Sequence, residues 1–141
     1  AFMAQIHLAN EVKKPLMLHI REAYKDAYEM LRTDAKVKGN VHFFAGTWED
    51  AKWFLDLGFT LSFTGVITFA RDYDEVIRNT PLNMLLTETD APYVTPVPFR
   101  GKRNEPLHVR EVVKKIAEIK GVSEEEARLA TLTNARRVFS L

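Results

Sequence analysis

Short apolar runs alternate with stretches of helical periodicity along the whole chain. Four runs are bounded by turn-forming residues and have the length of buried strands, at residues 15–19, 41–44, 60–63 and 83–87. Apolar residues recur at helical spacing in the stretches between and after them, at residues 2–12, 22–37, 48–57, 69–78, 107–120, 123–132 and 134–139. Strands that alternate with helices predict an α/β fold with a parallel sheet.

Local signals place several boundaries of these elements. Thr47 has the chemistry of a helix N-cap and Gly58 that of a C-cap, and Ser123 with Glu126 is a capping-box pattern. Gly39 and Asn40 predict a turn before the second strand. A polar loop that contains several prolines, residues 89–105, follows the fourth strand. No linker or repeat divides the 141 residues, so we expect one domain over residues 1–141.

Four parallel strands are half of an eight-stranded barrel, but they also suffice for a small open sheet. An open sheet would need cover for both edge strands, and the sequence supplies no obvious protection. The first helical stretch begins at Phe2 with no capping residue before it, as expected of a fragment that starts inside an element. Half a barrel should also expose apolar surface, because barrel core layers draw side chains from all eight strands.

The composition excludes several classes of protein. The formal net charge is +1, so a nucleic acid would have to be bound by a local basic patch. The chain has no cysteine, which rules out disulfides and thiolate metal sites. Its apolar runs are far shorter than the roughly 20 residues of a membrane helix, and no signal peptide is evident. We therefore expect a cytoplasmic protein without membrane partners.

Three residues that can bind metal stand at or near strand ends. His19 closes the first strand, His42 lies within the second, and Asp90 follows the fourth. Carboxyl ends of parallel strands meet at one edge of the sheet, where functional groups collect. Imidazole together with carboxylate suits a divalent ion such as zinc or manganese. Each residue alone also has a structural explanation, since Asp90 can cap the turn before Pro92.

A second signal is the basic stretch RGKRNEP at residues 100–106. In a barrel this loop would lie over the mouth of the pocket, where Arg and Lys can bind phosphate, although a solvated charged loop is equally consistent. Aromatic side chains in or near loops could stack on bases or pack in the core: Phe69, Tyr73, Tyr93 and Phe99. His7 and His108 are predicted to be structural or surface residues.

Several stretches together resemble the TatD family of metal-dependent hydrolases. They are LMLHIR (16–21), VHFFAG (41–46), GFTLSFTG (58–65), LTETDAPY (86–93), RGKRNEP (100–106) and NARRVF (134–139). The match runs in order through nearly the whole chain. The resemblance implies the C-terminal half of a TIM (β/α)8 barrel, with about four parallel strands and flanking helices. It also implies a divalent-metal phosphodiesterase with 3′-to-5′ exonuclease activity on DNA.

The resemblance also assigns roles to residues. It implies that His19 and His42 bind one metal ion, and that Asp90 binds another ion or is the base for the attacking water. It suggests phosphate-binding roles for Arg21, Arg100 and Arg103. The ion would be magnesium, manganese or zinc, and the substrate single-stranded DNA or a DNA 3′ end.

The chain also departs from the family pattern. It lacks the first strand with its His-x-His pair and the strand whose glutamate bridges two metals, so it holds about half of the ligand set. Phe43 and Ala45 stand where we expect Cys and Ser. A deoxyribonuclease fragment with one weakly bound metal is the leading hypothesis, its partner being the N-terminal half or a second copy. The alternatives are a D-aminoacyl-tRNA deacylase and a non-catalytic half-barrel that self-associates.

Overall fold

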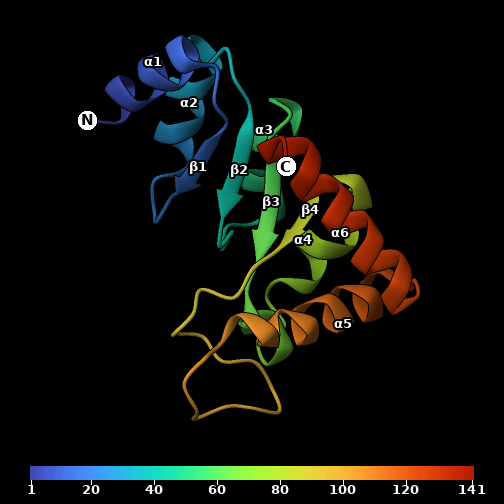
Figure 1. The fold of residues 1–141 in the computed structure, drawn as a ribbon. Coiled ribbons are helices and arrows are strands. Elements are labelled where there is room, and N and C mark those ends of the chain that lie inside the picture. Colours follow the sequence, from blue (N-terminus) through green and yellow to red (C-terminus); the bar gives the residue numbers. More distant parts are fainter.

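The computed structural model describes all 141 residues and contains a four-stranded parallel sheet with the strand order β1-β2-β3-β4. The strands are β1 (Leu16–His19), β2 (Gly39–His42), β3 (Thr60–Phe63) and β4 (Leu85–Thr87). All strands run in the same direction, so their carboxyl ends lie at one edge of the sheet (Figure 1). This confirms the predicted α/β fold with four parallel strands and flanking helices.

Six α-helices accompany the sheet: α1 (Phe2–Val12), α2 (Tyr24–Asp34), α3 (Trp48–Asp56), α4 (Asp74–Asn79), α5 (Val109–Lys120) and α6 (Glu124–Phe139). Short 3-10 turns lie at Gly65–Thr68, Leu82–Met84 and Pro106–His108. Each of α1 to α4 contacts the next along the chain, while α5 and α6 pack against each other and against β4. None of the helices combines the length and the apolar character that crossing a membrane requires.

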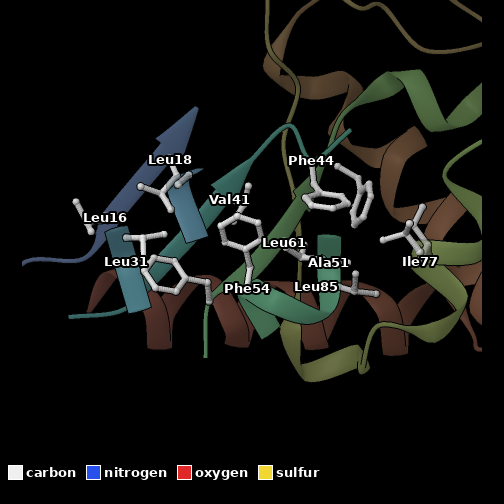
Figure 2. Close-up of a cluster of buried hydrophobic side chains, with 14 of the residues drawn as sticks. Leu16, Leu18, Leu31, Val41, Phe44, Ala51, Phe54, Leu61, Ile77 and Leu85 are labelled. Carbon is white, nitrogen blue, oxygen red and sulfur yellow. The ribbon is translucent and has the colours of Figure 1, made fainter. Parts of the chain in front are cut away.

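The hydrophobic core lies between one face of the sheet and the helices that follow the strands. Alternate strand residues contribute Leu16, Leu18, Val41, Leu61 and Leu85. The helices supply Leu31, Ala51, Phe54 and Ile77, as Figure 2 shows. Almost all of these side chains are fully buried, which fixes the position of each strand relative to its helix.

The opposite face of the sheet is mostly polar, with Leu86 as its buried apolar residue. Asn40, Thr60 and Ser62 are buried there, while Met17 and His19 are exposed. In a complete barrel this face would line the interior. The strands therefore present polar side chains to the space beside their carboxyl ends.

The predicted turn at Gly39 and Asn40 is wrong, because both residues belong to β2, which ends at His42 rather than Phe44. Gly39 pairs with Leu16 of β1 at such close range that a Cβ on Gly39 would lie 1.8 Å from the Leu16 carbonyl oxygen. Glycine is therefore required here for the close approach of two strands.

The last two predicted helices form one continuous helix, α6, so the predicted break between them is also wrong. Asn134 lies inside this helix, where its buried side chain donates hydrogen bonds to the carbonyls of Leu82 and Leu85, both at 2.9 Å. The predicted helix at residues 69–78 is shorter and starts later, as α4.

The predicted N-caps of α3 and α6 are present, but the C-cap of α3 is Leu57, one residue before the predicted Gly58, and α6 forms only one half of the predicted capping box. Thr47 and Asp50 form a reciprocal capping box at the start of α3. Gly58 follows that helix with a φ of 81°, a conformation that favours glycine. Ser123 accepts a hydrogen bond from the Glu126 N–H at 3.1 Å, which caps α6.

The close approach at Gly39 gives a first prediction. Gly39→Ala should lower the free energy of unfolding by about 3 kcal/mol or more, because the added methyl group must push β1 and β2 apart. Urea denaturation followed by circular dichroism measures the loss. Gly101→Ala is the control, since its Cβ would meet no atom within 4 Å and only its positive φ costs about 1 kcal/mol. Equal losses in the two variants would contradict the steric explanation.

Candidate metal centre

The first two predicted metal ligands lie side by side at the carboxyl ends of neighbouring strands. His19 and His42 are register partners in the pairing of β1 with β2, and their ring centroids are 5.6 Å apart. His19 is exposed and makes no hydrogen bond, whereas His42 is mostly buried, with 22% of its side chain accessible. The two imidazoles therefore border the same space, but only His42 is held in place by polar contacts.

Asp90 reaches this space from the loop after β4. Its Oδ1 lies 3.4 Å from Nε2 of His42. Two atoms that bind one ion at about 2.1 Å each lie roughly 3.0–3.4 Å apart, between octahedral and tetrahedral geometry. The separation of His42 and Asp90 therefore fits two ligands of a single divalent ion.

The centre is incomplete within this chain. No group of three or more histidine and acidic side chains is arranged to hold a metal ion. The His42 and Asp90 donor atoms form a pair, and the exposed His19 ring is the nearest further candidate. Two or three ligands leave a divalent ion with open positions, as in catalytic sites, but they bind it weakly.

Glu88 is a component of the centre that was missing from the predicted site. Its Oε2 contacts Nδ1 of His42, and its Oε1 accepts hydrogen bonds from the Phe43 N–H at 2.6 Å and from the Ser62 hydroxyl at 2.5 Å. Strand alternation does place Glu88 on the same side as Asp90, and this was the available signal. Its contact with a histidine from another strand depends on the register of the sheet.

Two backbone positions beside the centre have positive φ angles, although neither residue is glycine. Phe43, directly after His42, has a φ of 46°, and Asp90 has a φ of 55°. Residues other than glycine are uncommon in the left-handed backbone region, and residues with such strained conformations concentrate at functional sites. At Phe43 this conformation turns the chain out of β2 while its N–H binds Glu88.

The basic loop extends beyond the carboxyl ends of the strands (Figure 1). Arg100 lies over the ring of Phe69, 3.9 Å from its centroid, and donates a hydrogen bond to the Thr95 carbonyl at 3.1 Å. Arg103 is exposed and makes no ion pair or hydrogen bond. Of the two arginines, Arg103 is therefore the freer to bind a phosphate.

The same loop is tied to the candidate metal centre by the buried side chain of Asn104. Its amide group donates to the carbonyls of Thr89 at 2.8 Å and Tyr93 at 2.6 Å, on either side of Asp90. In the sequence, Asn104 stands out only as part of the basic stretch at residues 100–106. The structure shows that it fixes the segment carrying Asp90. His108 supports it, with Nδ1 3.0 Å from the Asn104 amide oxygen, which agrees with a structural role.

Arg21 lines a cleft of about 520 Å³ at the carboxyl ends of β1 and β2. His19, Tyr24 and Phe43 also line this cleft, which places a cation and an imidazole along one opening. The Tyr24 hydroxyl accepts a hydrogen bond from the Ala45 N–H at 3.0 Å, and burial raises the pKa of Tyr24. Tyr24 therefore stays a neutral hydroxyl in the lining of the cleft.

The candidate base-stacking residues differ in accessibility. Tyr93 is 71% exposed beside Asp90 and is free to stack on a ligand. Phe99 already stacks on His108, Phe69 lies under Arg100, and Tyr73 packs edge-on against Phe63. His7 is exposed on α1, 3.7 Å from Asp34, in agreement with a surface role.

Comparison with known proteins places this chain in a family. The TatD related DNase model matches residues 1–140. The uncharacterized metal-dependent hydrolases YabD of Bacillus subtilis and YcfH of Escherichia coli are 42% and 40% identical over 99% and 100% of this chain. The TatD homologue YjjV of Escherichia coli superposes with a TM-score of 0.89 at 30% identity, over 97% of this chain and 54% of its own.

The chain spans about half the length of these relatives, 56% of YabD and 55% of YcfH. Four parallel strands with flanking helices match part of a TatD-type barrel, as the resemblance implied. The relatives' names support a divalent metal as the cofactor of this group of hydrolases. The chain belongs to the TatD related DNase family.

Proposed function

We propose that this chain is the C-terminal half of a divalent-metal hydrolase that cleaves phosphodiester bonds in DNA as a 3′-to-5′ exonuclease. One observation carries the proposal: His42 Nε2 and Asp90 Oδ1 lie 3.4 Å apart at the carboxyl ends of two parallel strands. That spacing suits two ligands of one ion. The family's description as DNases supports DNA as the substrate class.

Each residue of the centre has its own role in the proposed hydrolysis. A bound divalent ion would polarise a phosphoryl oxygen and lower the pKa of a coordinated water. His42 and Asp90 would hold that ion, and His19 would supply a third donor by rotation of its exposed side chain. The second carboxylate oxygen of Asp90 is available to accept a proton from the attacking water.

The substrate's phosphates would be bound by arginines outside the metal centre. Arg103 projects from the loop that Asn104 ties to the Asp90 segment, Arg100 lies in the same loop, and Arg21 lines the neighbouring cleft. Because the net charge is only +1, DNA would be attracted by this local group of cations and not by the whole protein. The open cleft and the exposed Tyr93 suit a single-stranded 3′ end, which can present an unstacked base.

The remaining ligands would come from the other half of the barrel. An open groove of about 790 Å³ runs along β1 between α1 and α2, and apolar side chains predominate in it. Leu8, Val12, Met17 and Met30 are all 39–57% exposed there, which confirms the apolar surface expected of half a barrel. A strand paired with the free edge of β1 and its helix would cover them, and the relatives are long enough to include both.

The metal centre yields a test on the chain itself. Calorimetric titration with Mn²⁺ should show one weak site, and His42→Ala should weaken it by at least about tenfold, because it removes a ligand. His7→Ala, which alters an exposed histidine on α1, serves as the control and should leave the affinity unchanged. Equal weakening in both variants, or none in His42→Ala, would exclude His42 as a ligand.

Activity should depend on the second half of the barrel. Joining this chain to the N-terminal half of a TatD-type barrel should produce metal-dependent release of nucleotides from the 3′ end of single-stranded DNA. EDTA should abolish the release. A folded, metal-loaded fusion that instead hydrolyses D-aminoacyl-tRNA would favour the deacylase alternative. Light scattering that shows a strict monomer of the isolated chain would exclude a second copy as the occupant of the groove.

The role of Arg103 is testable through binding. Arg103→Ala should weaken binding of a single-stranded oligonucleotide several-fold and reduce the salt dependence of log K by about 0.7, the value for one phosphate contact. Fluorescence anisotropy over a salt series measures both effects. Arg128→Ala is the matched control, because Arg128 on α6 is already paired with Glu125. An unchanged salt slope in Arg103→Ala would remove this arginine from the phosphate contacts.

A further inference from the structure

We infer that Glu88 is the positioning residue of the metal centre: its carboxylate holds the proton of His42 on Nδ1, so that Nε2 remains free to bind the ion. The inference rests on the metal-binding role proposed for His42. It assigns Glu88 a task distinct from those of Asp90 and His19, namely to select the tautomer of a neighbouring imidazole.

The two nitrogens of His42 face two different carboxylates. Nδ1 contacts Glu88, whereas Nε2 faces Asp90 at the longer distance of 3.4 Å. A neutral imidazole has one proton, so the two carboxylates compete for it. If the proton were on Nε2, it would point at Asp90 and occupy the position that the metal requires. The shorter contact with Glu88 favours the other tautomer, in which Nε2 carries the lone pair.

Glu88 is itself fixed by two further donors. Its Oε1 accepts hydrogen bonds from the Phe43 N–H and the Ser62 hydroxyl, while Oε2 contacts His42. Both oxygens of Glu88 are therefore occupied by groups of the protein. This arrangement distinguishes Glu88 from Asp90, whose carboxylate has no such partners and remains available to a metal.

A chain of buried hydrogen bonds runs across the sheet toward Glu88. The Thr60 hydroxyl donates to the Asn40 amide oxygen at 3.1 Å, and the Asn40 amide nitrogen donates to the Ser62 hydroxyl oxygen at 2.7 Å. Ser62 in turn donates to Glu88. The hydroxyls of Thr60 and Ser62 also lie near the carbonyls of Gly39 and Val41, at 3.2 and 3.3 Å, but the shortest contact of the series, at 2.5 Å, is the one that Ser62 makes with the Glu88 carboxylate.

The residues of this hydrogen-bond series are buried, which indicates that they serve to hold Glu88. Asn40, Thr60 and Ser62 are each at most 2% exposed, on the face of the sheet that lines the site. Buried polar side chains cost stability unless they are hydrogen-bonded, and apolar residues would pack here without that cost. The three residues come from β2 and β3, and the series of bonds ends at Glu88, just after β4. Side chains from three strands therefore contribute to the orientation of the His42 imidazole.

The experiment compares the metal-free tautomer of His42 with the affinity of the same chain for Zn²⁺. In the wild type at a pH where the ring is neutral, nitrogen-15 NMR should show the proton of His42 on Nδ1. Glu88→Gln should shift the population toward the Nε2–H form and weaken Zn²⁺ binding by about 10–100-fold, as loss of an outer-shell partner does. Ser62→Ala should cause a smaller shift in the same direction.

Two further variants separate positioning from charge. Glu88→Asp keeps the negative charge but shortens the side chain, so it should behave like Glu88→Gln if geometry matters. Glu11→Gln, an exposed carboxylate of α1, should leave both readouts unchanged. Circular dichroism of each variant checks that the fold is retained.

The outcomes are distinct. An unchanged tautomer together with unchanged affinity in Glu88→Gln would overturn the inference. So would an unchanged tautomer with complete loss of Zn²⁺ binding, because Glu88 would then be a ligand itself. If the wild type binds no Zn²⁺, the proposed metal function fails, while the tautomer comparison on the metal-free chain still decides whether Glu88 positions His42.

Discussion

The parallel register of β2 against its neighbours is the constraint on which the candidate site depends. It pairs His42 with His19 on one side and brings β4, with Glu88 just beyond it, within reach on the other. A shift of one residue would turn His42 toward the helices and Val41 toward the site, because strand side chains alternate between faces. The full burial of Val41 and the close approach at Gly39 oppose that shift. Packing on one face thus determines chemistry on the other.

The two faces of the sheet are stabilised by different kinds of interaction. The helix-covered face is held by apolar packing, which is strong but tolerant of small rearrangements. The site face is held by directional hydrogen bonds among Thr60, Asn40, Ser62 and Glu88. These bonds hold the Glu88 carboxylate against His42, and an outer-shell partner of this kind orients a metal-binding imidazole. Because these side chains are shielded from water, their hydrogen bonds are stronger, and the loss of any one partner would cost more stability.

Sequence reasoning succeeded where the signal is local and failed where the cause is tertiary. The four strands, the helices after them and the Thr47 cap follow from periodicity and capping chemistry, and the resemblance identified the family. Gly39 looked like a turn residue, because only the pairing with Leu16 reveals the need for a missing side chain. Asn134 looked like a helix break, because its backbone partners lie about 50 residues away. Glu88 lies two residues before Asp90, on the same side of the extended chain, but its contact with His42 requires the register of β2, β3 and β4.

The incomplete metal centre and the exposed groove along β1 are two aspects of one arrangement. They meet at His19, which lines the groove along the free edge of β1 and also stands beside His42 at the carboxyl ends of the strands. A strand added at that edge would cover Met17 and would place new side chains next to His19. Metal binding and docking of that strand would then be thermodynamically linked, since each stabilises the state that the other requires. A centre with only His42 and Asp90 as close donors is suited to such coupling, because a weak site gains more from each added ligand than a saturated one.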